Sequence, residues 1–448
     1  MESLHERHDA MKIMQLTPGS GDNFYCENCL RDLGLVRAIG GLGHEMVMVP
    51  LYLPVSVGGE RAETSAPVFF GGINVYLQQK LDLFQRTPRW IDRVLDSDKL
   101  LNLVGRKASM TDARTLGEMT VSMLRGEDGR QAKELERLAV WLCEGENRPD
   151  VVVLSNALLA GAAGVIRKRV GAKVVCLLQD EDGFLDGLGE PYASEAWRLV
   201  AGRVRDIDAF ISVSGYFAEV MKRRLSIEEG KMHVAHAGIS LEGWDSLRLE
   251  PESPTVGYLS RMSGAHGLDT LVEAFALLKR DAALAATKLK IAGGQTGADA
   301  AFLRVINKRL ASSGLAADVD FVSAYGPEER YAFLRGLSVL SVPEKRPVAC
   351  GLYVVESLAA GVPAVEPAGG VFDEMESLTG GACVTYEPND ARTLARALTG
   401  LLKDRERLRA LGEAGKAAVF EKFDVRRAAD RMVRILEEVV KGGRESIC

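Results

Sequence analysis

The sequence predicts an α/β protein with two Rossmann-like, doubly wound domains. Short apolar strands alternate with helical patterns twice along the chain, and a polar stretch with two prolines, residues 243–255, separates the two series. The length of 448 residues exceeds what one hydrophobic core usually supports. Alternating strands and helices are typical of parallel sheets covered by helices on both faces. We therefore expect two α/β domains joined by a linker.

The first domain is expected over residues 11–245, after a leader at 1–10. A strand from Met11 is followed by a small-residue loop and a helical pattern that ends in glycines. Residues 81–145 carry mixed charge and helical patterns, so we expect a mainly helical insertion there. The remaining predicted strands are short apolar runs, at 44–53, 151–155, 173–179 and 209–214.

The second domain is expected over residues 255–425, where the alternation begins again. Its predicted strands lie at 255–260, 288–294, 319–325, 337–343 and 362–370. Residues 426–448 form a separate terminal segment. Met432, Ile435, Leu436 and Val439 recur there at helical spacing, which predicts an amphipathic helix.

Composition narrows the classes of function. The net charge of −6 argues against nucleic acid as a partner. No run of about 18 uncharged apolar residues suggests a membrane span. The first ten residues are charged and lack the apolar core of a secretory signal, so we expect a cytoplasmic protein. The seven cysteines are an odd number and five are scattered, which agrees with a reducing compartment.

The spacing Cys26–x–x–Cys29 is the exception among the cysteines. A redox pair would sit at a helix start, where thiolates are favoured. A zinc site would need a second pair of ligands, and none follows nearby in the sequence. The pattern favours a structural or substrate-lining role over both.

The most informative segment is CGLYVVESLAAGVPAV, residues 350–365. Gly351 opens a predicted helix, Gly361 ends it, and Pro363 prevents its continuation. The start of such a helix presents unpaired N–H groups and the positive end of a dipole, a site suited to phosphate. Glu356 lies about one turn further on, where a carboxylate can bind a sugar hydroxyl.

This segment resembles the donor-binding signature of the family 4 glycosyltransferases, which share the GT-B fold of two facing Rossmann-like domains. The family pattern is a Glu, seven residues and a second Glu; here the second is Glu356 and the first position holds Val348. The resemblance implies that the amides near Gly351, Leu352 and Tyr353 meet phosphate and that Glu356 binds the ribose. It also implies transfer with retention of configuration, no metal or other cofactor, and a terminal helix that packs back on the first domain.

A second matching segment follows the strand at 255–260. In the family, an Arg holds the donor diphosphate together with a Lys five residues later, which a Gly follows. Arg261 and Gly267 match, and His266 stands at the Lys position. An Arg suits a diphosphate because its fork donates two parallel hydrogen bonds, and fixed cations stabilise the charge on the leaving group. We therefore assign Arg261 a catalytic role as well as donor binding. A solvated loop residue remains the alternative for His266.

Four other candidates are supported by weaker sequence signals. Gly19 and Gly21, after the first strand, would let a donor phosphate approach the backbone, or would form an ordinary turn. Gln179 stands where many relatives have a His near the reacting carbon, and Gln cannot exchange a proton near neutral pH; we keep it as a tentative catalytic residue. Asp180 and Asp182 spell D-x-D, a metal motif of a different glycosyltransferase fold. His236 matches its family context only in part, and a structural role is favoured.

The leading interpretation is a retaining glycosyltransferase that uses a nucleotide-activated sugar. Gln179, His266 and Val348 depart from the family pattern, so the alternative is a catalytically weak relative that binds a nucleotide or glycan. A phosphorylase-like or epimerase-like enzyme on the same fold is the third hypothesis. The expected partners are a nucleotide sugar and an acceptor that could be a glycan, a lipid or a small molecule. Weak contact with a membrane surface stays open.

Overall fold

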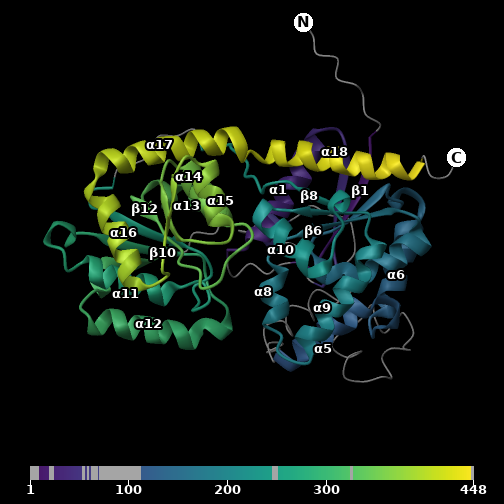
Figure 1. The fold of residues 1–448 in the computed structure, drawn as a ribbon, viewed down its shortest axis with the longest axis horizontal. Coiled ribbons are helices and arrows are strands. Elements are labelled where there is room, and N and C mark those ends of the chain that lie inside the picture. The colour runs from purple at the N-terminus through teal and green to yellow at the C-terminus, as the bar shows by residue number, and fades with distance from the viewer. Residues whose placement is uncertain are drawn as a thin grey trace, which may run out of the picture.

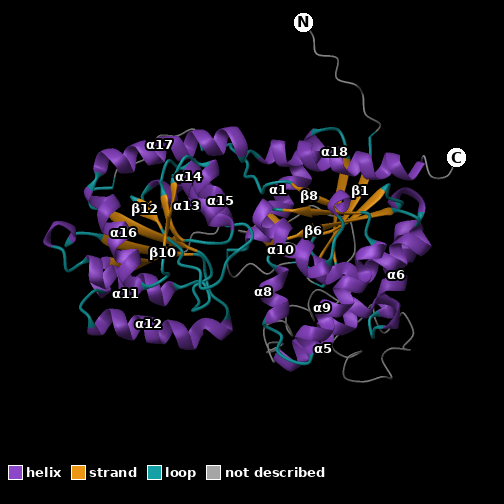
Figure 2. Cartoon of the chain, in the orientation of Figure 1, coloured by secondary structure: helices purple, strands orange, loops and turns teal. Residues whose placement is uncertain are grey.

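A computed structural model of the protein shows two lobes side by side, each built around a sheet flanked by helices (Figures 1 and 2). The structure describes residues 10–19, 25–52, 56–57, 60–61, 69, 113–244, 251–322 and 326–444. Both large sheets have six strands, and every neighbouring pair in them runs parallel. The predicted fold class, two doubly wound α/β units, is confirmed.

The sheet of the first lobe has the order β2-β1-β5-β6-β7-β8. The strand order reverses between β1 and β5, which creates a crevice at their carboxyl ends where such folds bind ligands. Its strands are β1 (Lys12–Thr17), β2 (Glu45–Pro50), β5 (Val151–Leu154), β6 (Lys173–Leu178), β7 (Ala209–Ser212) and β8 (Met232–Val234). A short antiparallel ribbon pairs β3 (Ser56–Val57) with β4 (Glu60–Arg61).

The helices of this lobe include two from the described part of the predicted insertion, α5 and α6. Residues 81–112 of that insertion lie outside the described residues. The helices are α1 (Glu27–Gly41), α5 (Ala113–Arg125), α6 (Ala132–Cys143), α7 (Ala163–Val165), α8 (Glu181–Asp186), α9 (Tyr192–Arg203) and α10 (Gly215–Leu225).

The sheet of the second lobe has the order β11-β10-β9-β12-β13-β14, with its reversal between β9 and β12. Its strands are β9 (Thr255–Leu259), β10 (Lys288–Ala292), β11 (Val319–Phe321), β12 (Val339–Leu340), β13 (Ala364–Pro367) and β14 (Cys383–Tyr386). Its helices are α11 (Leu268–Leu278), α12 (Ala300–Ser312), α13 (Pro327–Arg335), α14 (Leu352–Ala359), α15 (Val371–Leu378), α16 (Ala391–Lys403) and α17 (Arg405–Lys422).

The last helix, α18 (Val425–Arg444), lies over the first lobe and runs beside α1 (Figure 1). Its apolar side chains meet one face of the first sheet, because the amphipathic pattern puts them on a single stripe. They form one buried cluster with strand and helix residues of that lobe, among them Ile13, Leu35, Ile39, Val153, Val175, Ile211, Ala429, Met432, Ile435 and Leu436.

The chain passes between the lobes twice, and the two passages touch. The amide of Ile239 donates to the carbonyl of Phe423, and the amide of Val425 donates to the carbonyl of Ile239, both at 2.9 Å. A side chain at Gly238 would put its Cβ 2.7 Å from the backbone of Asp424, so only glycine fits this close approach. The two crossings therefore lie against each other at one place, the interlobe passage.

In the ranges that the structure covers, no helix combines the length and the apolar composition that crossing a bilayer requires.

Candidate functional site

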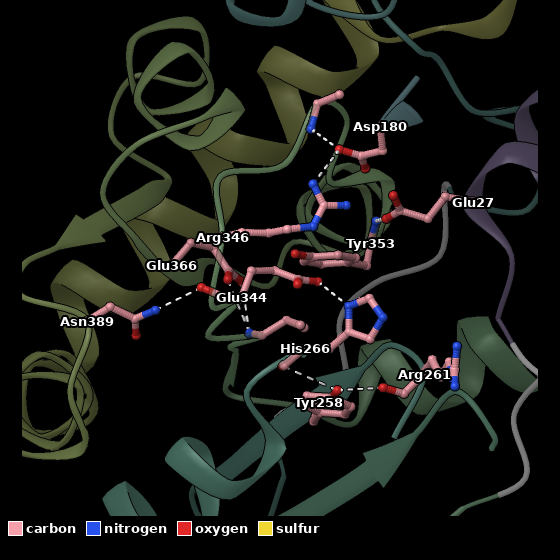
Figure 3. Close-up of polar contacts among 12 residues, drawn as sticks. Glu27, Asp180, Tyr258, Arg261, His266, Glu344, Arg346, Tyr353, Glu366 and Asn389 are labelled. Atoms are coloured by element: carbon pink, nitrogen blue, oxygen red, sulfur yellow. Dashed lines mark hydrogen bonds and ion pairs between the residues drawn. The ribbon is translucent and has the colours of Figure 1, made fainter. Parts of the chain in front are cut away.

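The candidate site lies between the lobes, where polar side chains from both lobes face each other (Figure 3). The second lobe contributes the loop after β9, with Arg261 and His266, and the long loop between β12 and α14. The first lobe contributes the start of α1 and the loop after β6. The start of α14 turns the amide of Tyr353 toward the first lobe, and free N–H groups at a helix start suit an anionic ligand.

The start of α14 forms as the sequence predicts. Gly351 adopts a left-handed conformation, with φ of 64°, just before the helix begins at Leu352. A Cβ there would lie 3.0 Å from Phe372, so glycine is required for both backbone and packing reasons. The amide of Tyr353, expected to meet phosphate, donates at 3.3 Å to Oε1 of Glu27 in the first lobe.

Glu356 is buried and its two carboxylate oxygens have different partners. Oε2 accepts a 2.8 Å hydrogen bond from the Tyr25 hydroxyl, and Oε1 accepts one of 3.2 Å from Nε of Arg330. Glu356 also lines a cavity of about 350 Å³ between α1, α13 and the interlobe passage, with lining residues that include Arg37, Trp244, Arg330, Tyr331 and Leu352. The carboxylate expected to bind ribose thus contacts two side chains that sequence reasoning missed.

Arg261 points along the second lobe. Its guanidinium forms a two-pronged ion pair with Asp299, with both N–O distances 2.9 Å, and Nη2 donates to the Thr296 hydroxyl at 3.0 Å. Burial opposes the charge of Asp299, but the hydrogen bonds from Arg261 and Thr296 outweigh it and hold the pKa of this carboxyl below its usual value. About a third of the Arg261 side chain stays exposed, so the guanidinium is fixed in direction while one side remains accessible.

His266 contacts a carboxylate. Its Nδ1 lies 2.7 Å from Oε1 of the buried Glu344 (Figure 3). With Nδ1 bound to the carboxylate, Nε2 is the atom that can meet a ligand. Asn389 holds the Glu344 backbone from the other side, because its amide donates to the Glu344 carbonyl at 2.8 Å. Glu344 therefore orients His266.

Val348 is buried among apolar side chains, with 6% of its surface exposed. Its carbonyl accepts a 3.0 Å hydrogen bond from the Val371 amide.

Gln179 lies behind the cleft surface. Its side chain is 4% exposed, and Nε2 donates to the Ser155 carbonyl at 2.6 Å. The side chain thus bridges the ends of β5 and β6. The Gln179 side chain therefore points into the first lobe and not toward Arg261 and His266 of the second lobe.

Asp180 is the residue of this loop that reaches the other lobe. Its backbone has φ of 59°, a value that is rare for residues other than glycine. Such backbone outliers cluster at functional sites. Its Oδ1 accepts a 2.8 Å hydrogen bond from the Ala349 amide and lies 3.8 Å from Arg346. Burial raises the pKa of Asp180 to about 6, although Arg346 opposes the rise.

The cation beside the D-x-D sequence is a guanidinium. Arg346 lies 3.6 Å from Asp182 as well as near Asp180. Among the residues that the structure describes, no three histidine, cysteine, aspartate or glutamate side chains are arranged to hold a metal ion.

Glu27 belongs to the same acidic group. Burial, followed by the charge of Asp180, raises the pKa of Glu27 to about 8, so this carboxyl carries a proton at neutral pH. A protonated carboxyl can donate a hydrogen bond with one oxygen while the other accepts from Tyr353. Neither Glu27 nor Arg346 stands out in the sequence, because each lies in a stretch with other charged residues.

The loop after β1 is described as far as Gly19 and again from Tyr25. Gly19 has φ of 88°, a conformation that favours glycine. Gly21, the second glycine expected near donor phosphate, lies outside the described residues.

His236 helps to join the lobes. Its Nε2 lies 2.6 Å from Oε1 of Glu374 in α15, and the same carboxylate accepts from the amides of Gly215 and Tyr216 at the start of α10. Nearby, the Ser214 hydroxyl donates to the Ala349 carbonyl at 2.7 Å. The two lobes are thus in direct contact on both sides of the loop that ends at Gly351.

The chain matches two models of glycosyltransferase families, one in each lobe. Residues 122–242 match the model of Glycosyltransferase Family 4, and residues 245–418 match that of Glycosyl transferases group 1. The boundary between the matches falls at the interlobe passage.

Curated relatives match over part of their length. A lipopolysaccharide core biosynthesis mannosyltransferase of Rhizobium meliloti is 29% identical over 45% of this chain and 56% of its own. An MMP α-(1→4)-mannosyltransferase of Mycolicibacterium hassiacum is 25% identical over 53% of this chain and 55% of its own. The matched region thus spans about half the length of these two mannosyltransferases.

Solved structures share the whole fold. The Anabaena protein HepE in complex with UDP superposes with a TM-score of 0.65 at 13% identity, over 96% of this chain and 100% of the other. Sucrose-phosphate synthase of Thermosynechococcus elongatus gives 0.67 at 16% identity, with 96% and 100% covered. Two matched family models that meet at the interlobe passage, on this two-lobed fold, show that the chain belongs to the family 4, group 1 glycosyltransferases of the GT-B fold.

Proposed function

We propose that this chain transfers a sugar from a nucleotide-activated donor to an acceptor, with retention of configuration at the anomeric carbon. The observation that carries the proposal is that Arg261, His266 and Tyr353, at the start of α14, lie in one region between the lobes (Figure 3). Cations and helix N–H groups there suit the diphosphate that leaves when the sugar–phosphate bond breaks.

Two of the proposed donor contacts replace contacts that the protein makes with itself. Phosphate oxygens would take the Tyr353 amide that now donates to Glu27. Ribose hydroxyls would take the carboxylate oxygen of Glu356 that now accepts from Tyr25. Arg261 already points at an anionic partner, Asp299, and its exposed side would bind phosphate. Donor binding would therefore require the start of α1 to withdraw from α14.

The relatives suggest which sugar donors to test first. HepE has been crystallised with UDP-glucose, and two of the matched relatives are mannosyltransferases. A hexose donor is therefore the first class to test, as glucose or mannose linked to UDP or GDP.

The sugar pocket is proposed to differ from that of relatives. Val348 is apolar and buried where the family has a carboxylate that touches the transferred sugar, and Glu344 contacts His266 instead of replacing it. Without that hydrogen bond, a nucleoside diphosphate should bind about as well as the full nucleotide sugar. This feature, with the buried Gln179, favours the second candidate function, a catalytically weak relative that binds a nucleotide.

The test combines turnover with binding. UDP- and GDP-linked glucose and mannose are offered to the protein, and release of the nucleoside diphosphate is measured. Calorimetry with UDP and GDP then compares wild type with Arg261→Ala, which should bind roughly 10- to 150-fold more weakly, as expected for a lost hydrogen bond to a charged group. The matched control is Arg309→Ala, since Arg309 forms an exposed pair with Glu273.

Binding that Arg261→Ala weakens, with turnover of one donor, supports the glycosyltransferase. The same binding without turnover of any donor selects the binding module. Equal affinity of wild type and Arg261→Ala would remove Arg261 from the site.

A further inference from the structure

The first turn of α1 holds two cysteines that the proposed transfer reaction does not use. Cys26 immediately precedes the helix, and Cys29 lies in its first turn. Both are reduced, and each is partly exposed. The two side chains are hydrogen bonded to each other. Positions three apart in a helical turn bring the Cα atoms into the range that a disulfide spans, about 4.4–6.8 Å.

The residues on either side of Cys26, Tyr25 and Glu27, both form hydrogen bonds with the second lobe. Tyr25 donates its amide to the Gly293 carbonyl at 2.8 Å and its hydroxyl to Glu356 at 2.8 Å. Glu27 accepts from the Tyr353 amide at 3.3 Å. Three contacts across the cleft therefore originate within one residue of Cys26, and two of them end on α14.

We propose that Cys26 and Cys29 are a redox-active dithiol whose disulfide fixes the first turn of α1 and keeps Tyr25 on Glu356. The effect on donor binding rests on the proposed function; formation of the disulfide does not. Fixing Cys26 to Cys29 restricts the backbone on both sides of Glu27, so the Tyr25–Glu27 segment loses the local freedom with which it would withdraw from α14. The oxidised protein then binds nucleotide more weakly than the reduced one.

The chemistry needs an external disulfide, for which oxidised glutathione is a suitable class. One cysteine thiolate attacks a sulfur of that disulfide, which forms a mixed disulfide and releases one thiol. The second thiolate attacks the protein sulfur of the mixed disulfide and releases the other thiol. Two protein thiols lose two electrons and two protons in total, and one small disulfide becomes two thiols.

The surroundings of Cys26 set the pace of this exchange. The hydrogen bond with Cys29, together with burial, raises the pKa of the Cys26 thiol well above its usual value. Because the thiolate is the attacking form, oxidation should speed up as pH rises.

Two alternatives make different predictions. A zinc site would need further ligands, and none of the described residues complete such a group of three. Purely structural thiols would tolerate replacement by serine without any response to oxidants.

The experiment uses the full chain with Cys143→Ser and Cys448→Ser, which removes an exposed cysteine and one outside the described residues. The protein is equilibrated in glutathione buffers of increasing potential and then alkylated. Intact mass counts the remaining thiols, and peptide mapping locates the bond. One intramolecular Cys26–Cys29 disulfide is the expected result. Failure to form it in the most oxidising buffer, or bonds to other cysteines, overturns the proposal.

The second measurement asks whether the disulfide acts across the cleft. Hydrogen exchange of the peptide that covers residues 351–356 should slow on oxidation in wild type and stay constant in Cys26→Ser/Cys29→Ser. Unchanged exchange in the oxidised protein overturns the coupling to α14. This measurement needs no ligand, so it stands even if the proposed function fails.

Calorimetry completes the test with UDP and GDP as probes. Oxidation should weaken binding about tenfold, the lower end of what a hydrogen bond to a charged group contributes, and the double serine variant should not respond. If neither nucleotide binds the reduced protein, the proposed function fails, and the hydrogen-exchange result alone decides the dithiol proposal.

Discussion

The hydroxyl of Tyr25 donates a 2.8 Å hydrogen bond to Glu356, a residue 331 positions later in the sequence and in the other lobe. Both side chains are buried. Burial, followed by the charge of Glu356, raises the pKa of Tyr25 well above its usual value, so the phenol keeps its proton and remains a donor. In the proposed reaction, Tyr25 and the donor ribose compete for the same carboxylate.

Tyr25→Phe should strengthen nucleotide binding. The variant removes the competing hydroxyl but keeps the ring, so the ribose no longer has to displace a hydrogen bond worth about 1.5–3 kcal/mol. We expect UDP or GDP to bind roughly 10- to 150-fold more tightly by calorimetry. Tyr192→Phe is the matched control, because that hydroxyl contacts Glu118 within the first lobe. Weaker binding to Tyr25→Phe would show that the phenol assists the donor.

Arg330→Met should destabilise the protein strongly. Arg330 and Glu356 form a buried ion pair, with 8% and 4% of their side chains exposed, and removing one partner leaves the other charge buried. Such losses cost about 3–5 kcal/mol in the free energy of unfolding, against about 0–1 kcal/mol for exposed pairs. Urea unfolding can compare this variant with Lys403→Met, which removes an exposed partner of Asp281. If both variants lost a similar free energy of unfolding, the Arg330–Glu356 pair would not be a buried ion pair.

Glu27 should make stability depend on pH. Its pKa rises from 4.5 to about 8 on folding because of burial and the nearby charges of Asp180, Glu344 and Glu356. The folded chain thus binds the proton more tightly, and the free energy of unfolding falls as pH rises from about 4.5 to 8. Glu27→Gln cannot titrate, so its unfolding should vary less between pH 6 and 8.

Glu136→Gln, which changes an exposed carboxylate paired with Arg169, serves as the control for that measurement. Glu181 titrates in an overlapping pH range, because burial raises its pKa to about 7. The decrease of the free energy of unfolding with pH should therefore be smaller in Glu27→Gln than in wild type, but should not vanish. An identical slope in wild type and Glu27→Gln would rule out a buried, protonated Glu27.

Glu374→Ala should loosen the contact between the lobes. Its carboxylate accepts from two amides of α10 and contacts His236, so one substitution removes three interactions across the gap. We expect a larger radius of gyration in solution scattering. Glu376→Ala, on the same helix, is the control because Glu376 contacts Thr385 within the second lobe. A radius equal to that of the control would mean that other contacts suffice.

The sequence was a good guide to the fold because the signals for it are local. Apolar runs such as 151–154 and 173–178 became strands within a residue of their expected ends. Gly351 marked the start of α14 because only glycine suits its backbone there.

The side-chain partners in the site could not be predicted, since they come from distant segments. Asp299 lies 38 positions from Arg261, and Tyr25 and Arg330 reach Glu356 from different lobes. The direction of the Gln179 side chain depends on the end of a neighbouring strand, which a linear pattern does not record.

The position of α18 means that the boundary between the lobes in space differs from the boundary along the chain. A fragment that ends at residue 245 would lack the helix that covers Ile13, Val153 and Val175. We expect such a fragment to aggregate, because a broad apolar sheet face would be open to water. Adding a synthetic peptide of residues 425–444 should restore its solubility. The first lobe can therefore finish folding only after residues 425–444 have been synthesised, so its maturation waits for the ribosome to pass through the second lobe.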